Sequence, residues 1–271
     1  NDIVKPDEGT VALFGTLAPG RTAQRRIGYL PEERGLYPKM TVRRVLTFLA
    51  ELRGLDRAAV APKITRWLDR LELGKWADAK VESLSKGMQQ KIQFIATVLH
   101  EPDLLILDEP FSGLDPLNAD VLREIVREQK AAGRTILFST HLMEHAEQLC
   151  DALCIIARSE RVLEGSLASV KGRARDARNA YRVELARQGG APPPALAPSP
   201  GMVVTRLPGE GTAFDVELDP GRPAGELLRR LMEDGEEIVR FERHVPTLHE
   251  IFVDHVRRHG ESGTRSGAGD A

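Results

Sequence analysis

Two carboxylates stand side by side in this sequence at the end of an apolar run. Asp108 and Glu109 follow Leu104 to Leu107. At the carboxyl end of a strand, one carboxylate can hold Mg²⁺ through water, and its neighbour can polarise an attacking water molecule. An acidic turn after a strand is common, so the pair alone would be weak evidence. Followed by the segment Pro110 to Pro116, it is strong evidence for phosphoryl-transfer chemistry.

A second candidate site lies upstream, at Ser85 and Gly87. Ser85 stands where it would cap a helix that begins near Lys86, and Gly87 lets a ligand approach the backbone. Free N–H groups at a helix N-terminus and a serine hydroxyl suit a phosphate group. An isolated Ser-x-Gly would be interpreted as an ordinary N-cap. Its position upstream of the acidic pair favours phosphate binding.

Two further polar residues follow predicted strands. His141 comes after Ser139-Thr140 and an apolar run, so we expect it at the strand ends, where it could hydrogen-bond a terminal phosphate and hold the attacking water. The other six histidines are interpreted as structural. Glu32 begins a loop that could reach the metal or a partner. A solvated turn carboxylate is an equally good interpretation of Glu32.

The phosphate-cradling pattern G-x-x-x-x-G-K-[ST] is not found in these residues, because none of the nine lysines is followed by Ser or Thr. The first residue is Asn1 rather than Met. We therefore expect an N-terminally truncated piece of a longer protein. A native start near Asn1 is the alternative.

The elements that must position these residues alternate between strand and helix. Apolar spacing predicts helices over 41–52, 58–71, 86–100, 118–132 and 141–149, and strands over 10–14, 26–30, 103–107, 135–139, 152–157 and 161–164. The runs at 103–107 and 135–139 are expected to be buried on both faces of a parallel sheet. The alternation predicts an α/β fold with a helical insert.

A smaller α+β region is expected after the basic stretch 171–175, which is interpreted as a loose connection. Strands are predicted over 181–185, 203–207, 213–218 and 237–243, a helix over 224–232, and an unstructured loop over the Gly-, Ala- and Pro-rich residues 188–201. Thr247-Leu248-His249-Glu250 is a capping box that should open a final helix reaching about Val256. The polar tail from Gly260 is expected to be disordered.

The composition excludes several classes of protein. The formal net charge is -2, so nothing points to nucleic acid as an electrostatic partner. No apolar run approaches the length that spans a bilayer. Cys150 and Cys154 are interpreted as small packing residues rather than a disulfide or a metal site.

Residues 1 to about 165 resemble the ATPase subunit of an ATP-binding-cassette (ABC) transporter. The resemblance rests on four segments in a fixed order: Ile27 to Glu32, Leu84 to Gln90, Leu104 to Glu109 and Ser139 to His141. It implies a P-loop NTPase-like sheet with a helical subdomain insert, followed by a small α+β domain. The implied domains are an ABC ATPase domain at 1–170, with the insert at about 41–100, an accessory domain at 171–258 and a disordered tail at 259–271.

The resemblance also implies a role for each matched residue. It makes Glu109 the catalytic glutamate and His141 the switch histidine. The implied Mg²⁺ ligands are Asp108 and Glu32, and the implied ATP-binding residues are Ser85, Gly87, Glu32 and Asp115. Three positions depart from the family pattern, because Glu32 replaces a glutamine, and Lys86 and Met88 replace the Gly and Gln of the commonest signature.

Partners and location follow from the same resemblance. Two such domains pair head to tail around ATP and drive a transmembrane permease, so the protein is expected in the cytoplasm, peripheral on the inner face of the cell membrane. The segment Pro246 to Phe252 resembles the C-terminal extension of sodium- and drug-exporter-type (ABC-2) ATPases. One alternative is a degenerate regulatory subunit that does not hydrolyse ATP. Another, a soluble member acting in translation or DNA maintenance, is disfavoured because the chain has one signature and no sustained heptads.

Overall fold

The computed structural model describes residues 7–17, 20–33, 35–186, 192–197, 199–207 and 212–262. The chain divides into two compact units, Asn1–Leu142 and Met143–Ala271, and each is described here by itself. This division falls ahead of the domain boundary predicted at residues 170 and 171. Most of the predicted tail, residues 263–271, lies outside the described residues.

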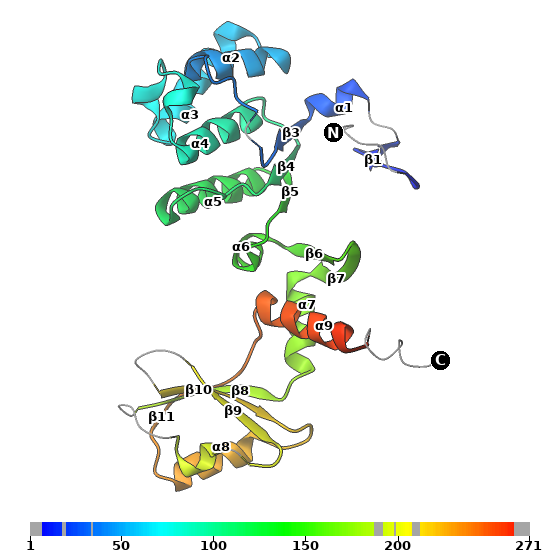
Figure 1. Cartoon of the computed structure of the whole chain (residues 1–271), viewed down its shortest axis with the longest axis vertical. Helices are drawn as coiled ribbons and strands as arrows, with labels where there is room; N and C mark the ends of the chain where they lie inside the picture. Colours follow the sequence, from blue (N-terminus) through cyan, green and yellow to red (C-terminus); the bar gives the residue numbers. More distant parts are fainter. Residues whose placement is uncertain are drawn as a thin grey trace, which may run out of the picture. The chain divides into compact units, whose positions relative to one another are not determined.

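The first unit contains a sheet of three parallel strands in the order β3-β4-β5 (Figure 1). These are β3 (Ile27–Leu30), β4 (Leu104–Asp108) and β5 (Thr135–Ser139). Asp108 is opposite Ser139 in the register of β4 and β5. Because parallel strands end at the same edge, Glu32, Glu109 and His141 all follow that edge. The predicted α/β class is confirmed.

The prediction that 135–139 is buried on both faces is wrong. Leu137 of β5 is 61% exposed, and Thr135 and Ser139 are exposed as well. Within the described part of the chain β5 pairs with β4 alone, so it is an edge strand there. The strand predicted at 10–14 is also shorter than expected, because β1 (Ala12–Leu13) turns back into β2 (Thr16–Leu17). The short helix α1 (Arg21–Arg25) was not predicted.

The helical insert forms as its apolar spacing predicts. It contains α2 (Val42–Leu52), α3 (Arg57–Arg70), the short 3₁₀ turns Gly74–Trp76 and Val81–Ser83, and α4 (Lys86–Val98). The side chain of Thr41 caps α2 and that of Asp56 caps α3, each accepting a hydrogen bond from a main-chain N–H three residues on. Leu46, Ile64 and Ile92 come from the three helices and are fully buried. After α4 the chain enters β4, and α5 (Pro116–Ala131) joins β4 to β5.

The second unit begins with α6 (Met143–Leu149), the antiparallel pair β6 (Ala152–Ala157) and β7 (Glu160–Ser166), and α7 (Leu167–Asp176). The expectation of a loose connection at 171–175 is wrong, because these residues lie in α7. The Ser166 side chain caps this helix by accepting a hydrogen bond from the Ser169 N–H. Val170 is its one buried residue among those described, so the helix carries little of the apolar periodicity that would have predicted it.

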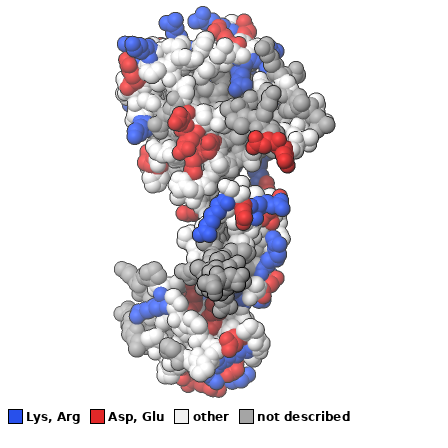
Figure 2. Space-filling view, turned by 45° about the vertical axis from the view of Figure 1, so that its right-hand side comes forward, with Lys and Arg blue, Asp and Glu red and all other residues white. Residues whose placement is uncertain are grey.

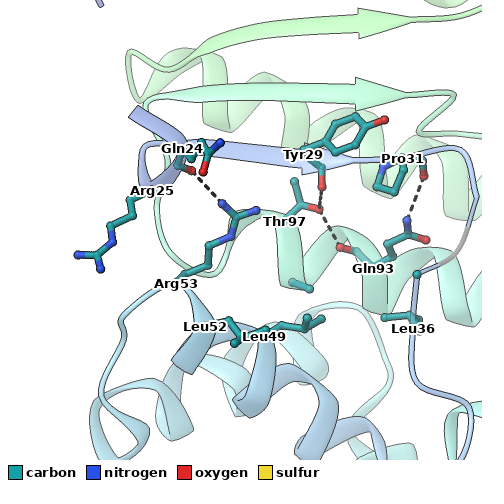
Figure 3. Close-up of a pocket in the computed structure, with 12 residues that line it drawn as sticks. Gln24, Arg25, Tyr29, Pro31, Leu36, Leu49, Leu52, Arg53, Gln93 and Thr97 are labelled. Carbon is teal, nitrogen blue, oxygen red and sulfur yellow. Dashed lines mark hydrogen bonds between the residues drawn. The ribbon is translucent and has the colours of Figure 1, made fainter. Parts of the chain in front are cut away.

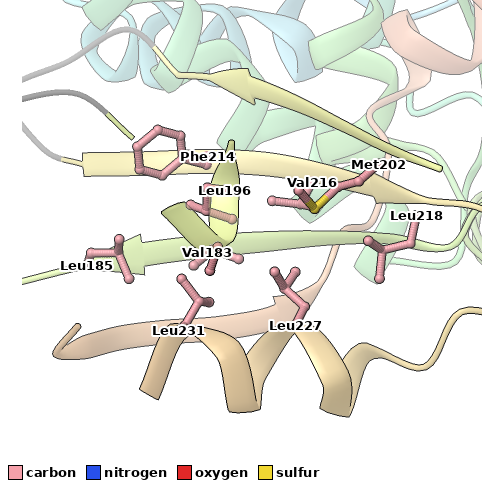
Figure 4. Close-up of a cluster of buried hydrophobic side chains, with 10 residues drawn as sticks. Val183, Leu185, Leu196, Met202, Phe214, Val216, Leu218, Leu227 and Leu231 are labelled. Carbon is pink, nitrogen blue, oxygen red and sulfur yellow. The ribbon is translucent and has the colours of Figure 1, made fainter. Parts of the chain in front are cut away.

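A four-stranded antiparallel sheet in the order β11-β8-β10-β9 follows (Figure 1). Its strands are β8 (Ala180–Leu185), β9 (Met202–Arg206), β10 (Thr212–Leu218) and β11 (Ile238–Arg243). Leu227 and Leu231 of α8 (Ala224–Glu233) point toward buried strand residues that include Val183 and Phe214 (Figure 4). The predicted α+β arrangement of this region is therefore present.

Two further expectations for this unit need correction. Part of the loop predicted at 188–201 is ordered by packing, because the 3₁₀ turn Pro194–Leu196 places Leu196 in the core with no exposed surface. Residues 188–191 and 198 of that loop lie outside the described residues. The final helix α9 (Leu248–Ser262) extends beyond the end predicted near Val256. Its capping box is confirmed, since Thr247 N donates to Glu250 Oε2 at 2.7 Å.

The surface carries both signs of charge close together. On the face shown in Figure 2, Lys and Arg side chains are interspersed with Asp and Glu side chains. No helix in the described residues combines the length and apolar character needed to cross a bilayer.

Candidate active site

The most developed site lies where β4 and β5 end. His141 N donates a hydrogen bond to Glu109 Oε1 at 2.8 Å, and His141 Nδ1 lies 2.7 Å from the same oxygen. The Glu109 side chain is 17% exposed, whereas that of His141 is 74% exposed. When Nδ1–H donates to the carboxylate, Nε2 is an acceptor in the neutral ring and a donor in the protonated ring. The arrangement holds the carboxylate in one position and keeps the imidazole accessible.

The backbone of Glu109 is also held in an unusual conformation. Its φ is +43°, a region that residues other than glycine rarely adopt. Glu109 N donates to Ser139 O at 3.2 Å, and Ser112 N donates to Glu109 O at 3.1 Å. Such conformations persist where surrounding contacts over-determine them, and they concentrate at functional sites. The turn places the Glu109 side chain beside His141.

Asp108 ends β4 beside this turn and is partly buried. The Ser139 hydroxyl donates a hydrogen bond to Asp108 Oδ1, and the Thr140 hydroxyl lies 3.5 Å from Glu109 Oε2. Neither hydroxyl was predicted from the sequence to have a role. The register between β4 and β5 is the signal that could have assigned Ser139, because it puts Ser139 directly opposite Asp108.

Ser85, Gly87 and Asp115 each have a role within the chain. The Ser85 side chain accepts a hydrogen bond from Met88 N and caps α4. A Cβ added at Gly87 would lie 3.3 Å from Gly113 O, so glycine lets the first turn of α4 approach that loop. Asp115 caps α5, and hydrogen bonds from the Asn118 side chain and N–H lower the pKa of its carboxyl group. Their assignment to nucleotide binding stays a prediction.

Glu32 is exposed in the bend after β3. Among the described residues, no hydrogen bond or ion pair reaches its carboxylate or joins it to Asp108. Its loop is nevertheless fixed, because Gln93 Nε2 of α4 donates to Pro31 O at 3.0 Å and to Glu33 O at 3.3 Å. Glu32 therefore follows the same edge of the sheet as Asp108, but the two carboxylates do not form a metal site within the described residues.

A cavity of about 610 Å³ lies beside this loop (Figure 3). Its lining combines the apolar side chains of Leu49 and Leu52 with Arg25, Arg53 and Gln93. Leu52 is 65% exposed, and Gln93 Oε1 is buried without a hydrogen-bond partner. Arg53 donates to Gln24 O at 2.8 Å, and burial lowers the pKa of its guanidinium group. The cavity therefore offers apolar surface and positive charge.

A different cluster of acids and histidine lies in the second unit. Asp215, His244 and Glu250 are the one group of three or more such residues, among those described, whose ligand atoms lie within 4.8 Å of one another. Arg182 pairs with both carboxylate oxygens of Asp215 at 2.9 and 3.0 Å, and Thr247 donates to Glu250. Asp215 lies 3.7 Å from His244 Nδ1, whereas Glu250 lies 3.5 Å from Nε2. Because Arg182 and Thr247 already occupy the carboxylate oxygens, we interpret this group as an ion-pair cluster.

Comparisons with known proteins identify the family to which this chain belongs. Residues 1–112 match the family described as ABC transporter, and residues 165–256 match the C-terminal domain of DrrA1-3-like ATP-binding proteins. An uncharacterized ABC transporter ATP-binding protein of Alkalihalophilus pseudofirmus is 42% identical over 255 residues, which cover 94% of this chain and 91% of that protein. The chain therefore belongs to the ATP-binding proteins of ABC transporters. The resemblance found in the sequence is confirmed.

Further relatives cover less of the chain. Nod factor export ATP-binding protein I of Burkholderia orbicola is 38% identical over 166 residues, which cover 60% of this chain and 55% of that protein. A solved structure described as an ATP binding subunit of an ABC transporter is 32% identical and has a TM-score of 0.59, covering 64% of this chain and 73% of that one. These matches agree with the ABC ATPase fold.

Proposed function

We propose that this chain is the ATP-hydrolysing subunit of an ABC exporter that drives a separate transmembrane permease. The observation that carries the proposal is the pairing of Glu109 with His141 at the carboxyl edge of the parallel sheet. In this role Glu109 accepts a proton from the attacking water, and His141 holds the water and the terminal phosphate. The positive φ of Glu109 supports a functional use of the turn.

Mg²⁺ bound with ATP would fit the donors at the same edge. Magnesium prefers oxygen ligands and keeps several waters. Asp108 supplies a carboxylate whose Oδ1 is fixed by Ser139, and Glu32 supplies an exposed carboxylate on the neighbouring loop. The ion would neutralise phosphate charge during transfer. Asp108 and Glu32 are thus its proposed ligands.

ATP binding is proposed to need a second ABC ATPase domain. Ser85 and Gly87, at the N-terminus of α4, and Asp115, at that of α5, would serve the nucleotide held mainly by the other domain. The α4 N-terminus suits an anion because its first N–H groups lack partners within the helix. Glu109 and His141 would serve the chain's own nucleotide.

The cavity beside the loop after β3 is the proposed contact for the permease. Leu49 and Leu52 offer apolar surface, and Arg25 and Arg53 suit an acidic residue. The name of the Burkholderia orbicola relative, a Nod factor export protein, supports export as the direction of transport. Through this contact the chain would be peripheral on the cytoplasmic face of the cell membrane.

The second candidate is a regulatory subunit that does not hydrolyse ATP. The observation that favours it is the lack of a G-x-x-x-x-G-K-[ST] pattern in these 271 residues. Glu109 and His141 would then be paired for structural reasons only. Measuring ATP binding by the native protein that contains this chain separates the two candidates.

The test compares Glu109→Gln with Glu124→Gln in that native protein, assembled with its permease. An amide cannot accept the proton, so Glu109→Gln should bind ATP, lower turnover by about 10²- to 10⁴-fold and accumulate as an ATP-bound dimer. Glu124 is exposed on α5 and paired with Arg127, so its variant should match the wild type. Wild-type turnover in Glu109→Gln would remove Glu109 from the role of base. Failure of the wild type to bind ATP would favour the regulatory subunit.

A further inference from the structure

One buried glutamine joins α4 to the turn that carries Glu109. The Gln90 side chain is 2% exposed, and its Nε2 donates a hydrogen bond to Pro110 O at 3.2 Å. Pro110 is buried and directly follows Glu109. Because proline has no N–H, its carbonyl is the only main-chain group through which another element can hydrogen-bond to this residue.

Other elements also support this turn. Phe111 packs edge-on against Phe138 of β5, with ring centroids 6.3 Å apart. This contact holds the turn against the sheet. Gly87 of α4 approaches this loop closely, since a Cβ added there would lie 3.3 Å from Gly113 O. The positive φ of Glu109 costs conformational energy and needs such supports. Gln90 supplies a directional one next to the reacting carboxylate.

Packing alone does not call for an amide at this position. An apolar side chain of similar length would fill the space, and a buried amide costs free energy unless it is hydrogen-bonded. A hydrogen bond fixes direction as well as distance, and this one ends one residue from Glu109.

We propose that Gln90 is a positioning residue for Glu109, holding the Glu109–Pro110 turn in the geometry that hydrolysis requires. The inference rests on the proposed function. Gln93, one turn further along α4, holds the loop that carries Glu32 in the same manner. The helix capped by Ser85 therefore fixes both carboxylate-bearing loops at the sheet edge.

The experiment compares Gln90→Met with Gln129→Met in the native protein assembled with its permease. Met keeps the side-chain length and removes the donor. Gln129 is also buried, and it lies near the C-terminal end of α5, where its side chain accepts a hydrogen bond from Arg134. The control therefore makes the same Gln-to-Met change at a site away from the Glu109 turn. We expect Gln90→Met to lower kcat about tenfold with KM for ATP within about twofold, because a small misplacement acts on the chemical step. Gln129→Met should leave both constants unchanged.

A double-mutant cycle tests whether Gln90 acts through Glu109. In a Glu109→Gln background, Gln90→Met should lower the residual turnover no further. An equal loss in both backgrounds, or wild-type kcat in Gln90→Met, would overturn the inference while the proposed function stands. Wild-type turnover in Glu109→Gln alone would overturn the proposed function itself.

Hydrogen exchange gives a second readout that does not depend on turnover. The N–H groups of Ser112 and His141, which donate to Glu109, should exchange faster in Gln90→Met and remain unchanged in Gln129→Met. If Gln90→Met fails to fold, Gln90→Asn withdraws the donor by one methylene and is measured instead. Unchanged exchange at both groups in the folded variant would contradict the proposal.

Discussion

Both units bring two carboxylates and a histidine close together, but the histidine is exposed in one unit and buried in the other. At the sheet edge of the first unit His141 is 74% exposed and pairs with Glu109, beside Asp108. In the second unit the His244 side chain is 8% exposed between Asp215 and Glu250. The first histidine can reach a ligand in solvent, whereas the second is enclosed.

The groups that contact the carboxylates also differ between the two units. Arg182 neutralises Asp215 through two hydrogen bonds, and the side chain and N–H of Thr247 both donate to Glu250. No ion pair with Lys or Arg to Asp108 or Glu109 occurs among the described residues. Unneutralised carboxylates at a strand end remain free to bind a cation or take a proton, whereas neutralised ones stabilise the fold. Residue type alone therefore does not separate the proposed active site from the structural cluster.

The largest expected contrast comes from changing His141. We expect His141→Gln to lower ATP turnover of the native protein by about 10²-fold, because the exposed ring is proposed to hold the water and the phosphate. The free energy of unfolding should change by less than about 0.5 kcal/mol, since the side chain is mostly exposed. Steady-state turnover and urea unfolding measure the two effects. A loss of stability with unchanged turnover would make this region structural, as in the second unit.

Removing Arg182 should give the reverse result. Arg182→Met leaves Asp215 without its two charge-assisted hydrogen bonds, so the free energy of unfolding should fall by about 1–2 kcal/mol while turnover is unchanged. Asp215 is only partly buried, which keeps the loss below that of a fully buried pair. Arg240→Met is the control, because Arg240 is 57% exposed in its pair with Glu242. A lowered turnover with unaltered unfolding would instead assign chemistry to the cluster.

The smallest effect is expected from the pH dependence of Glu250. Burial raises the pKa of this carboxyl group, but the Thr247 hydrogen bonds and His244 together bring it below the ordinary value of 4.5. A depressed pKa stabilises the fold above the ordinary value, and the contribution is lost as pH falls through the folded value. Unfolding free energies of the wild type should therefore decline more steeply with acidification than those of Glu250→Gln. Parallel curves would show that Glu250 does not titrate differently on folding.

Local patterns predicted much of this molecule correctly. The spacing of Val45, Leu46 and Leu49 predicted α2, and the capping box at Thr247 predicted the start of α9, because both signals depend on neighbours within one or two turns. The edge position of β5, the helix at 171–175 and the buried Leu196 were missed. Each of these depends on which distant element packs against the segment.

The family and the order of its four matching segments could be predicted from the sequence alone, and so could the candidate residues proposed to take a proton or bind a cation. This was possible because residue types and short spacings carry that chemistry directly. Only the tertiary structure decided that Glu109 lies 2.7 Å from His141, that Ser139 bonds Asp108 and that Gln90 reaches Pro110. The physical reason is that strand register and helix packing join residues far apart in the chain, and they also decide which charges are neutralised.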